Sequence, residues 1–319
     1  MNKRSMVMLV LWVSMLSVLV WGQEPPPGFG AVSQYRFGVG ARALALGGAY
    51  TAVAVGPAGL YWNPAGLAWT GLTAGGMYTQ PFGDPDIRLQ YLAGAAPIEG
   101  WGVGAGWFNY HVANIPHTEV GTFFNYDSSV FQLGVGREVK LLQTGPRVAI
   151  GVSLKLYYEQ MLEGRALGLG WDLGVKVVGD DWSLGYCAQD VGTTRYRWQG
   201  TGQEPMVVVP WVHRVGMARW FADRKWLVSL EVVVEPEHAP QFQGGLEWTP
   251  VSGFALQGGV QLVRELGQHR YQPRFSFGGS FRWESFLFET GYLYRPLAVE
   301  AGGEGFGTDT YVFSLWVDF

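Results

Sequence analysis

Short segments in which apolar residues alternate with small or polar residues recur along most of this chain. In 148–156 the even positions carry Val, Ile, Val, Leu and Leu, and the odd positions carry Ala, Gly, Ser and Lys. In 167–175 the odd positions carry Leu, Leu, Trp, Leu and Val, and the even positions carry Gly, Gly, Asp and Gly. Successive side chains of a strand point to opposite faces, so this period of two predicts β-strands with one apolar face.

Two architectures use such strands, a soluble β-sandwich and a closed barrel in a membrane. The polar faces are crowded with glycine and charge, which suits a narrow lumen better than the solvated exterior of a sandwich. Aromatic residues form 15% of the chain and gather near the ends of the predicted strands, as in the interfacial girdles of a barrel. Charged residues are also only 15%, below the about 25% of a typical soluble domain. The sequence therefore predicts an all-β protein, a transmembrane antiparallel up-and-down β-barrel.

The alternating segments number 14, and single-chain outer-membrane barrels have even strand numbers. Short turns follow the even strands, whereas long connections at 111–125, 191–207 and 295–307 follow odd ones. Short periplasmic turns and long outer loops are the expected asymmetry of such a barrel. The predicted strands are 71–80, 86–96, 101–110, 126–140, 146–158, 164–178, 181–190, 208–220, 225–235, 240–249, 252–263, 270–282, 285–294 and 308–319.

Residues 1–22 have the pattern of a secretory signal peptide. Lys3 and Arg4 precede an apolar run that ends at Trp21, and Pro25 follows it closely. An uncleaved anchor is the alternative, but the run is shorter than the about 20 residues that a spanning helix needs. We predict export with cleavage. Loss of the two cations leaves 20 of the 22 basic residues against 26 acidic ones, which argues against a nucleic-acid partner.

Residues 23–70 precede the first predicted strand and are rich in glycine and alanine. The segment is too long for a linker and too apolar to be left in water. We predict that it forms a plug, or hatch, inside the barrel of residues 71–319, with a short helix within 41–55. A phosphate-binding loop is excluded, because no Gly-x-x-x-x-Gly-Lys pattern is present and no strand precedes the glycines.

The centre of the predicted hatch is Asn63-Pro64-Ala65-Gly66. Pro64 lacks the backbone donor that strand pairing requires. Asn63 is expected to close a turn with its side chain.

Charged residues recur on the polar faces of the predicted strands. A charge that faced lipid at mid-depth would cost about 2–4 kcal/mol, so these residues are expected to point inward. Lys155 and Asp172 fall on adjacent strands and are expected to pair. The charges either pair with one another and fill the barrel, or line a polar path that the hatch opens and closes. The predicted lumen charges are Lys155, Asp172, Lys176, Glu231, Glu247, Arg274, Arg282 and Glu289.

Nothing in the sequence predicts catalysis. The five histidines are scattered without metal-ligand spacing, and no nucleophile stands beside a base. Glu231 and Glu247 could form a pair of carboxylates, but pairing with Arg or Lys is the favoured interpretation. The single cysteine, Cys187, lies in a strand pattern and excludes a disulfide framework. We expect no catalytic residue, no metal site and no cofactor, and therefore no enzyme.

The hatch sequence is similar to the N-terminal signature of the PorV/PorQ family, within the FadL-like outer-membrane β-barrels. The residues that carry the similarity are 40–50 and 60–67, and the blocks 151–155 and 184–192 agree with later parts of the family. Two features depart from it: Gly56-Pro57 replaces a usual acidic pair, and the outer loops are smaller than those of the fatty-acid transporters. The resemblance covers nearly all of the mature chain and implies a 14-stranded barrel with an Asn-Pro-Ala hatch inside.

The resemblance implies one of two functions in the cell outer membrane. The favoured one is the passage of small hydrophobic solutes through a hatch-gated barrel. The other is a docking barrel of a type IX-like secretion system, whose partners would be secretion-system proteins. An outer-membrane lipase or protease is disfavoured, because the exposed Ser or His-Asp set that it needs is not found. The terminal Phe319 resembles the signal read by the barrel assembly machinery, which is an expected partner together with outer-membrane lipids.

Overall fold

The computed structural model describes residues 35–117, 120–140, 145–200, 204–236, 238–264, 270–294 and 309–319. The predicted signal peptide, the first part of the predicted hatch at 23–34 and the expected loop at 295–307 lie outside these residues.

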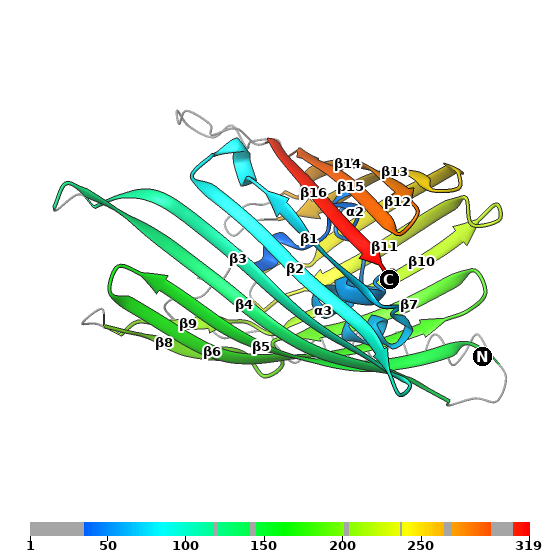
Figure 1. Ribbon diagram of the computed structural model, residues 1–319, viewed down its shortest axis with the longest axis horizontal. Coiled ribbons are helices and arrows are strands. Elements are labelled where there is room, and N and C mark those ends of the chain that lie inside the picture. The colour runs from blue at the N-terminus through cyan, green and yellow to red at the C-terminus, as the bar shows by residue number, and fades with distance from the viewer. Residues whose placement is uncertain are drawn as a thin grey trace.

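The described residues form an antiparallel sheet of 16 strands that closes on itself (Figure 1). All but β8 and β9 follow one another around a barrel of 14 strands, in which β1 pairs with both β2 and β16. The predicted closed barrel is thus confirmed. The strands are β1 (Thr73–Thr79), β2 (Ile87–Ile98), β3 (Trp101–His117), β4 (Thr122–Val139), β5 (Arg147–Met161), β6 (Gly164–Val178), β7 (Trp182–Gln189), β8 (Thr194–Gln199), β9 (Met206–Val209), β10 (Val212–Phe221), β11 (Trp226–Val234), β12 (Gln241–Val251), β13 (Phe254–Val263), β14 (Gln272–Trp283), β15 (Phe286–Tyr294) and β16 (Asp309–Asp318).

The barrel wall has an apolar outer face and a small or polar inner face. Along β6, buried and exposed residues alternate from Gly164 to Lys176, and the exposed ones include Leu167, Leu169 and Trp171. Leu169 is 76% exposed, although leucine is usually buried in a soluble domain. Almost all of the remaining barrel strands also carry large exposed apolar side chains. The outer surface is therefore an apolar belt suited to hydrocarbon.

Leu230, at the middle of β11, tests this belt. Its side chain faces outward and is 52% exposed. Leu230→Arg is expected to lower the free energy of unfolding in lipid vesicles by about 2–4 kcal/mol, because the charge would lie at mid-depth in hydrocarbon. Leu230→Ala is the matched control for lost side-chain volume. Equal unfolding free energies for the two variants would contradict the assignment of this face to lipid.

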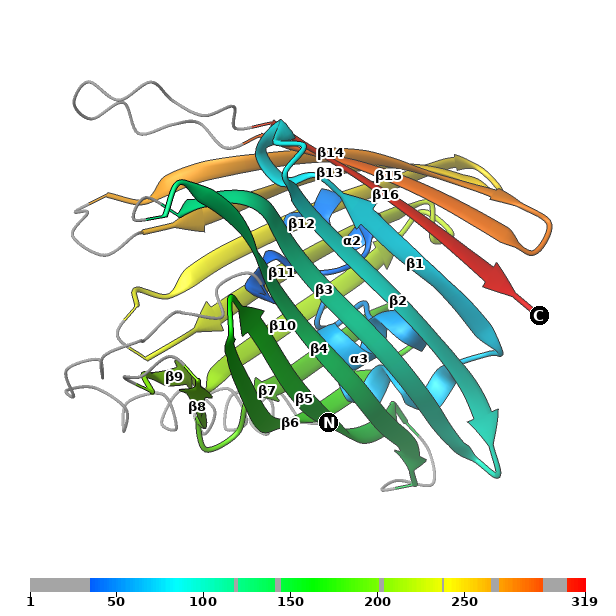
Figure 2. The same cartoon turned by 60° about the vertical axis from the view of Figure 1, so that its left-hand side comes forward.

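The connection expected at 111–125 is mainly strand, so that prediction is wrong. β3 continues to His117 and β4 begins at Thr122, with an irregularity between Val112 and Ile115 where Asn114 has a φ of 53°. The hairpin projects beyond the neighbouring strands at the end of the barrel opposite to the C-terminus (Figures 1 and 2). Above the apolar belt both faces of a strand can be polar, so the loss of alternation there does not mark a loop.

The prediction of a long loop at 191–207 is wrong in part, because β8 lies within this range and β9, which pairs with β8, begins at Met206 and continues to Val209. Two residue pairs join β8 to β6, between Arg165 and Gln199 and between Ala166 and Trp198. Tyr196 of β8 is 5% exposed and its ring stacks on Tyr157 at 5.9 Å. The hairpin therefore packs against the inner side of the wall.

Short helices lie between Tyr35 and Trp69, and one more follows β1. They are η1 (Tyr35–Phe37), α2 (Ala41–Ala45), η2 (Gly56–Ala58), α3 (Gly59–Trp62), η3 (Pro64–Trp69) and η4 (Pro81–Gly83). The helix predicted within 41–55 is thus only five residues long. It ends because Gly47 and Gly48 have φ values of 67° and 76°, in the left-handed region that favours glycine. No helix of the described residues has the length and apolarity to cross a membrane.

Candidate functional site

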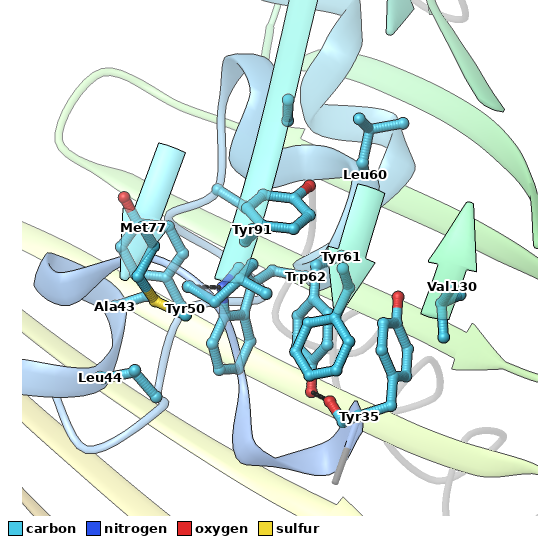
Figure 3. Packing of buried hydrophobic residues seen from close by; sticks show 14 of the residues in the cluster. Tyr35, Ala43, Leu44, Tyr50, Leu60, Tyr61, Trp62, Met77, Tyr91 and Val130 are labelled. Carbon is cyan, nitrogen blue, oxygen red and sulfur yellow. Dashed lines mark hydrogen bonds between the residues drawn. The ribbon is translucent and has the colours of Figure 1, made fainter. Parts of the chain in front are cut away.

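Residues 35–70, here called the hatch, lie inside the ring of strands (Figure 2). α2 contacts β13 to β16, and η3 contacts β2 to β6 on another side of the barrel. The hatch supplies Leu44, Leu60 and Trp62 to a buried apolar cluster, and the wall supplies Tyr91 and Val130 (Figure 3). The apolar lead-in that would be insoluble in water is therefore buried by the inner face of the barrel.

Asn63 closes the turn between α3 and η3. Its side chain accepts a hydrogen bond from the backbone N–H of Ala65 at 3.1 Å, and its amide donates to the carbonyls of Thr51 and of Val175 in β6, each at 3.1 Å. Asn63 is fully buried, and its side chain both caps the start of η3 and fastens the hatch to the wall.

Pro64, Ala65 and Gly66 sit where no further atoms fit. A Cβ at Gly151 of β5 would lie 2.3 Å from the carbonyl group of Pro64, and one at Gly174 of β6 would lie 2.9 Å from the Ala65 nitrogen. A Cβ at Gly66 itself would lie 2.3 Å from the carbonyl oxygen of Ala54. Glycine at these positions allows the hatch backbone to touch the wall directly.

Four of the eight predicted lumen charges, Lys176, Glu231, Glu247 and Glu289, bind the hatch. The Glu231 carboxylate accepts from the backbone N–H groups of Tyr50 and Thr51 at 2.9 and 2.8 Å. The Lys176 ammonium donates to the carbonyl of Ala54 at 2.6 Å. These side chains satisfy hatch backbone groups that short helices leave unpaired.

Arg42 in α2 also joins the hatch to the wall. Its guanidinium forms two hydrogen bonds with Glu247 of β12, at 2.6 and 2.8 Å. Its backbone N–H faces Glu289 of β15 at 3.4 Å, and Glu289 also accepts from the indole of Trp316 at 3.2 Å. Arg42 was not predicted to have a role, although it is an isolated charge within an apolar segment and that isolation is a readable signal.

Lys155 and Asp172 meet as predicted, at 2.6 Å, and both side chains are fully buried. Asp190 completes the group. Its carboxylate lies 2.6 Å from the Lys155 ammonium, and the backbone N–H of Asp190 donates to Asp172 at 2.8 Å. Asp190 has a φ of 54°, and this left-handed conformation just after β7 turns it back over β5. The Lys155 ammonium lies 5.4 Å from the ring of Tyr35 and so also touches the start of the described hatch.

The last two predicted lumen charges lie toward opposite ends of β14. Arg274 lines the cavity described below. Arg282 is exposed at the end nearest the C-terminus and pairs with Asp318 at 2.5 Å, so it does not line the enclosed lumen. Phe319 is close to that pair, is 79% exposed, and donates its backbone N–H to the carbonyl of Leu72 at 2.9 Å.

A cavity of about 430 Å³ lies between the hatch and the end of the barrel opposite to the C-terminus. We call it the vestibule. Its floor includes Tyr61 and Trp62, which are held by hydrogen bonds from the Tyr61 hydroxyl to the Tyr35 carbonyl at 2.8 Å and from the Trp62 indole to the Val39 carbonyl at 2.9 Å. Burial raises the pKa of Tyr61 to about 12, so its phenol stays protonated and keeps donating at neutral pH.

The vestibule wall combines aromatic and polar side chains. The polar ones include Gln189 and Asp190 near the end of β7, Arg214 of β10 and Gln261 of β13. Arg214 forms an ion pair with Glu231 at 2.9 Å, and its guanidinium lies 4.8 Å from the ring of Trp62. Arg214 therefore connects the vestibule wall both to Trp62 in the floor and to the Glu231 carboxylate, which binds the hatch backbone.

The described residues contain no cluster of three or more His, Cys, Asp or Glu side chains that could hold a metal ion. Cys187 is buried in β7.

Neither protein-family models nor curated proteins match the chain. Solved structures do. The chain is similar to the toluene transporter TbuX of Ralstonia pickettii, with a TM-score of 0.58 and 14% identity over 88% of this chain and 98% of that one. It is similar to the toluene transporter TodX of P. putida, with a TM-score of 0.57 and 13% identity over 88% and 99%. A deltaS2 mutant of the TodX monoaromatic hydrocarbon channel gives a TM-score of 0.55 and 14% identity over 88% and 98%. The chain therefore shares the barrel fold of these transporters.

Proposed function

We propose that this protein is an outer-membrane channel of the PorV/PorQ type that passes small hydrophobic solutes, with the hatch as its gate. The observation that carries the proposal is the vestibule, whose floor is made by hatch residues and not by the wall. A solute that enters from this end meets Tyr61 and Trp62 and advances only if they move. The shared fold with solved toluene transporters supports passage of small hydrophobic solutes.

The location follows from the same features. An apolar belt around a closed barrel is stable only in a bilayer, and a barrel of this kind leaves no unpaired strand edge in lipid. We infer that the chain is exported with cleavage of 1–22 and inserted by the barrel assembly machinery, with Phe319 as part of the insertion signal.

A disulfide that locks the hatch to the wall tests the gate. A Cβ at Gly216 of β10 would lie 3.4 Å from the Cβ of Ala52, close to the separation of about 3.5–4.5 Å found in disulfides. In a Cys187→Ala background, Ala52→Cys with Gly216→Cys is expected to stop solute permeation into vesicles when oxidised, and reduction is expected to restore it.

A second pair within the wall provides the matched control. Ala74 of β1 and Gly94 of β2 lie directly opposite each other on the outer face, and a Cβ at Gly94 would lie 3.6 Å from that of Ala74. Ala74→Cys with Gly94→Cys should leave permeation unchanged in both redox states. Permeation through the oxidised Ala52–Gly216 variant at the rate of its reduced form would refute a moving hatch.

A docking barrel for protein secretion is the second candidate. Its supporting observation is the projecting β3–β4 hairpin, near whose tip Val120 and Phe123 are 66% and 69% exposed. Deletion of the gene separates the two functions, because a channel loses uptake of a hydrophobic compound whereas a docking barrel loses secretion of its cargo.

A further inference from the structure

The vestibule presents hydrogen-bonding groups that the protein itself does not use. Arg214 is 8% exposed, and among the described residues its only hydrogen bond is from Nε to Glu231. The two terminal amino groups of its guanidinium therefore have no hydrogen-bond partner in the part of the chain that the structure describes. An arginine held by an ion pair and by a ring contact is a fixed donor, since little rotational freedom remains to be lost.

Acceptors lie in the same vestibule. The Gln189 amide donates to the carbonyl of Tyr61 at 2.8 Å, and the Gln261 amide donates to the carbonyl of Gly47 at 2.9 Å. Each donor bond fixes its side chain, and within the described ranges no group donates to the Oε1 atom of either residue. Because both amides are held by the hatch, their acceptor atoms are placed before any solute arrives.

Four of the five charged residues that line the vestibule, all but Arg274, form ion pairs within the described residues. Arg36 pairs with Glu235, Arg214 pairs with Glu231, and Asp190 contacts the buried Lys155. An anionic solute that bound Arg214 would compete with Glu231, which also accepts two hatch N–H groups. An uncharged solute avoids this competition.

We propose that the vestibule selects small uncharged aromatic solutes that carry a hydroxyl group, such as phenols and aryl alcohols, over the parent hydrocarbons. This inference rests on the proposed function. A hydroxyl group both donates and accepts, so it can bond to the Arg214 guanidinium and to a glutamine Oε1, while its ring packs against Tyr61 and Trp62. A bare hydrocarbon would displace water from Arg214 without replacing its hydrogen bonds, which is costly for a buried polar group. The volume of about 430 Å³ lies within the range of small-ligand sites and suits one ring better than a long acyl chain.

Three solutes that differ by one group test the inference. All three share a methylated benzene ring. Toluene carries no polar group, p-cresol carries a hydroxyl group and p-toluate carries a carboxylate. Radiolabelled solutes are equilibrated by dialysis against the full mature protein in detergent micelles, with protein-free micelles as the blank for partitioning. We expect p-cresol to bind about tenfold more tightly than toluene, because one buried hydrogen-bonded group is worth about that factor. We expect p-toluate to bind less tightly than p-cresol.

Arg214→Lys keeps the positive charge opposite Glu231 but removes the planar set of donors. It is expected to raise the dissociation constant of p-cresol several-fold, which corresponds to about 1 kcal/mol of lost hydrogen-bond free energy. The dissociation constant of toluene is expected to stay within about twofold of that of the unmodified protein. Gln189→Met provides an independent variant with the same expectation. Arg219→Lys is the control on the same strand, since Arg219 faces outward near the other end of β10.

Each outcome has a distinct meaning. Equal affinities for toluene and p-cresol, with toluene still permeating vesicles, would overturn the hydroxyl preference and leave the channel intact. Tighter binding of p-toluate than of p-cresol would overturn the preference for uncharged solutes. Failure of all three solutes to bind and to permeate would instead refute the proposed function.

Discussion

Lys155→Met is expected to lower the free energy of unfolding of the barrel by about 3–5 kcal/mol, the cost of leaving a buried charge without its partner. Lys155 lies 2.6 Å from Asp172 and 2.6 Å from Asp190, and the exposed fractions of the three residues are 1%, 0% and 4%. Removal of the ammonium group leaves two buried carboxylates close together without a cation between them. Urea unfolding in lipid vesicles, followed by tryptophan fluorescence, measures the change.

Two further variants separate the buried pair from a general effect of losing a cation. Arg147→Met removes a partly exposed pair with Glu138 at 2.5 Å and should cost less than about 1 kcal/mol. Adding Asp172→Asn and Asp190→Asn to Lys155→Met should recover most of the lost free energy, because no unpaired charge then remains. If Lys155→Met cost no more than Arg147→Met, the buried group would not stabilise the barrel.

The barrel could be predicted because the residues of each strand alternate between those suited to lipid and those suited to the lumen. Lipid meets one face of β6 and the lumen meets the other, so Leu167, Leu169 and Trp171 alternate with glycines and Asp172 in the sequence. The pairing of Lys155 with Asp172 followed from the same alternation, because a tight turn joins β5 and β6 and places both residues on the inner face. Local period and short turns carry this information without any knowledge of distant contacts.

Contacts between the hatch and the wall could not be predicted in this way. Glu231 was expected to face inward, and it does, but besides Arg214 it binds the backbone N–H groups of Tyr50 and Thr51, some 180 positions earlier. A sequence gives no register between an irregular segment and the strands that surround it. Glu231 and Glu247 do pair with arginines, Arg214 and Arg42, as expected. The interpretation that the lumen charges pair among themselves failed for Lys176, whose ammonium donates to the hatch carbonyl of Ala54.

The sequence does not single out Asp190, although this residue belongs to the most buried charge group. It stands at the end of a strand in a stretch that continues with Gly192 and Thr193, which reads as an ordinary turn. Its left-handed conformation returns the carboxylate to Lys155 and to the hydroxyl of Tyr157 at 2.8 Å. A polar residue just after the end of a barrel strand can therefore point into the lumen, even where the sequence around it reads as a loop.

Gly151→Ala is expected to displace the hatch and raise the passive conductance of the barrel. The added Cβ would lie 2.3 Å from the carbonyl group of Pro64, which is backbone and has no rotamer that moves it aside. Overpacking of this kind costs about 1–3 kcal/mol in a well-packed core. The displacement should reach Asn63, whose bond to Val175 of the next strand is directly adjacent, so the hatch loses an anchor as well. Single-channel recording in planar bilayers measures the conductance, and urea unfolding measures the stability.

Gly94→Ala is the matched control, because it makes the same substitution on the outer face. A Cβ there would lie 3.6 Å from the Cβ of Ala74, an ordinary contact, so neither conductance nor stability should change beyond about 0.5 kcal/mol. A difference between the two variants isolates the inner face from any general effect of adding a methyl group to a strand. Should Gly151→Ala conduct and unfold like Gly94→Ala, the hatch would not be seated on β5 at all. In that case Asn63 and the lumen charges would have to hold it without direct contact between its backbone and the wall.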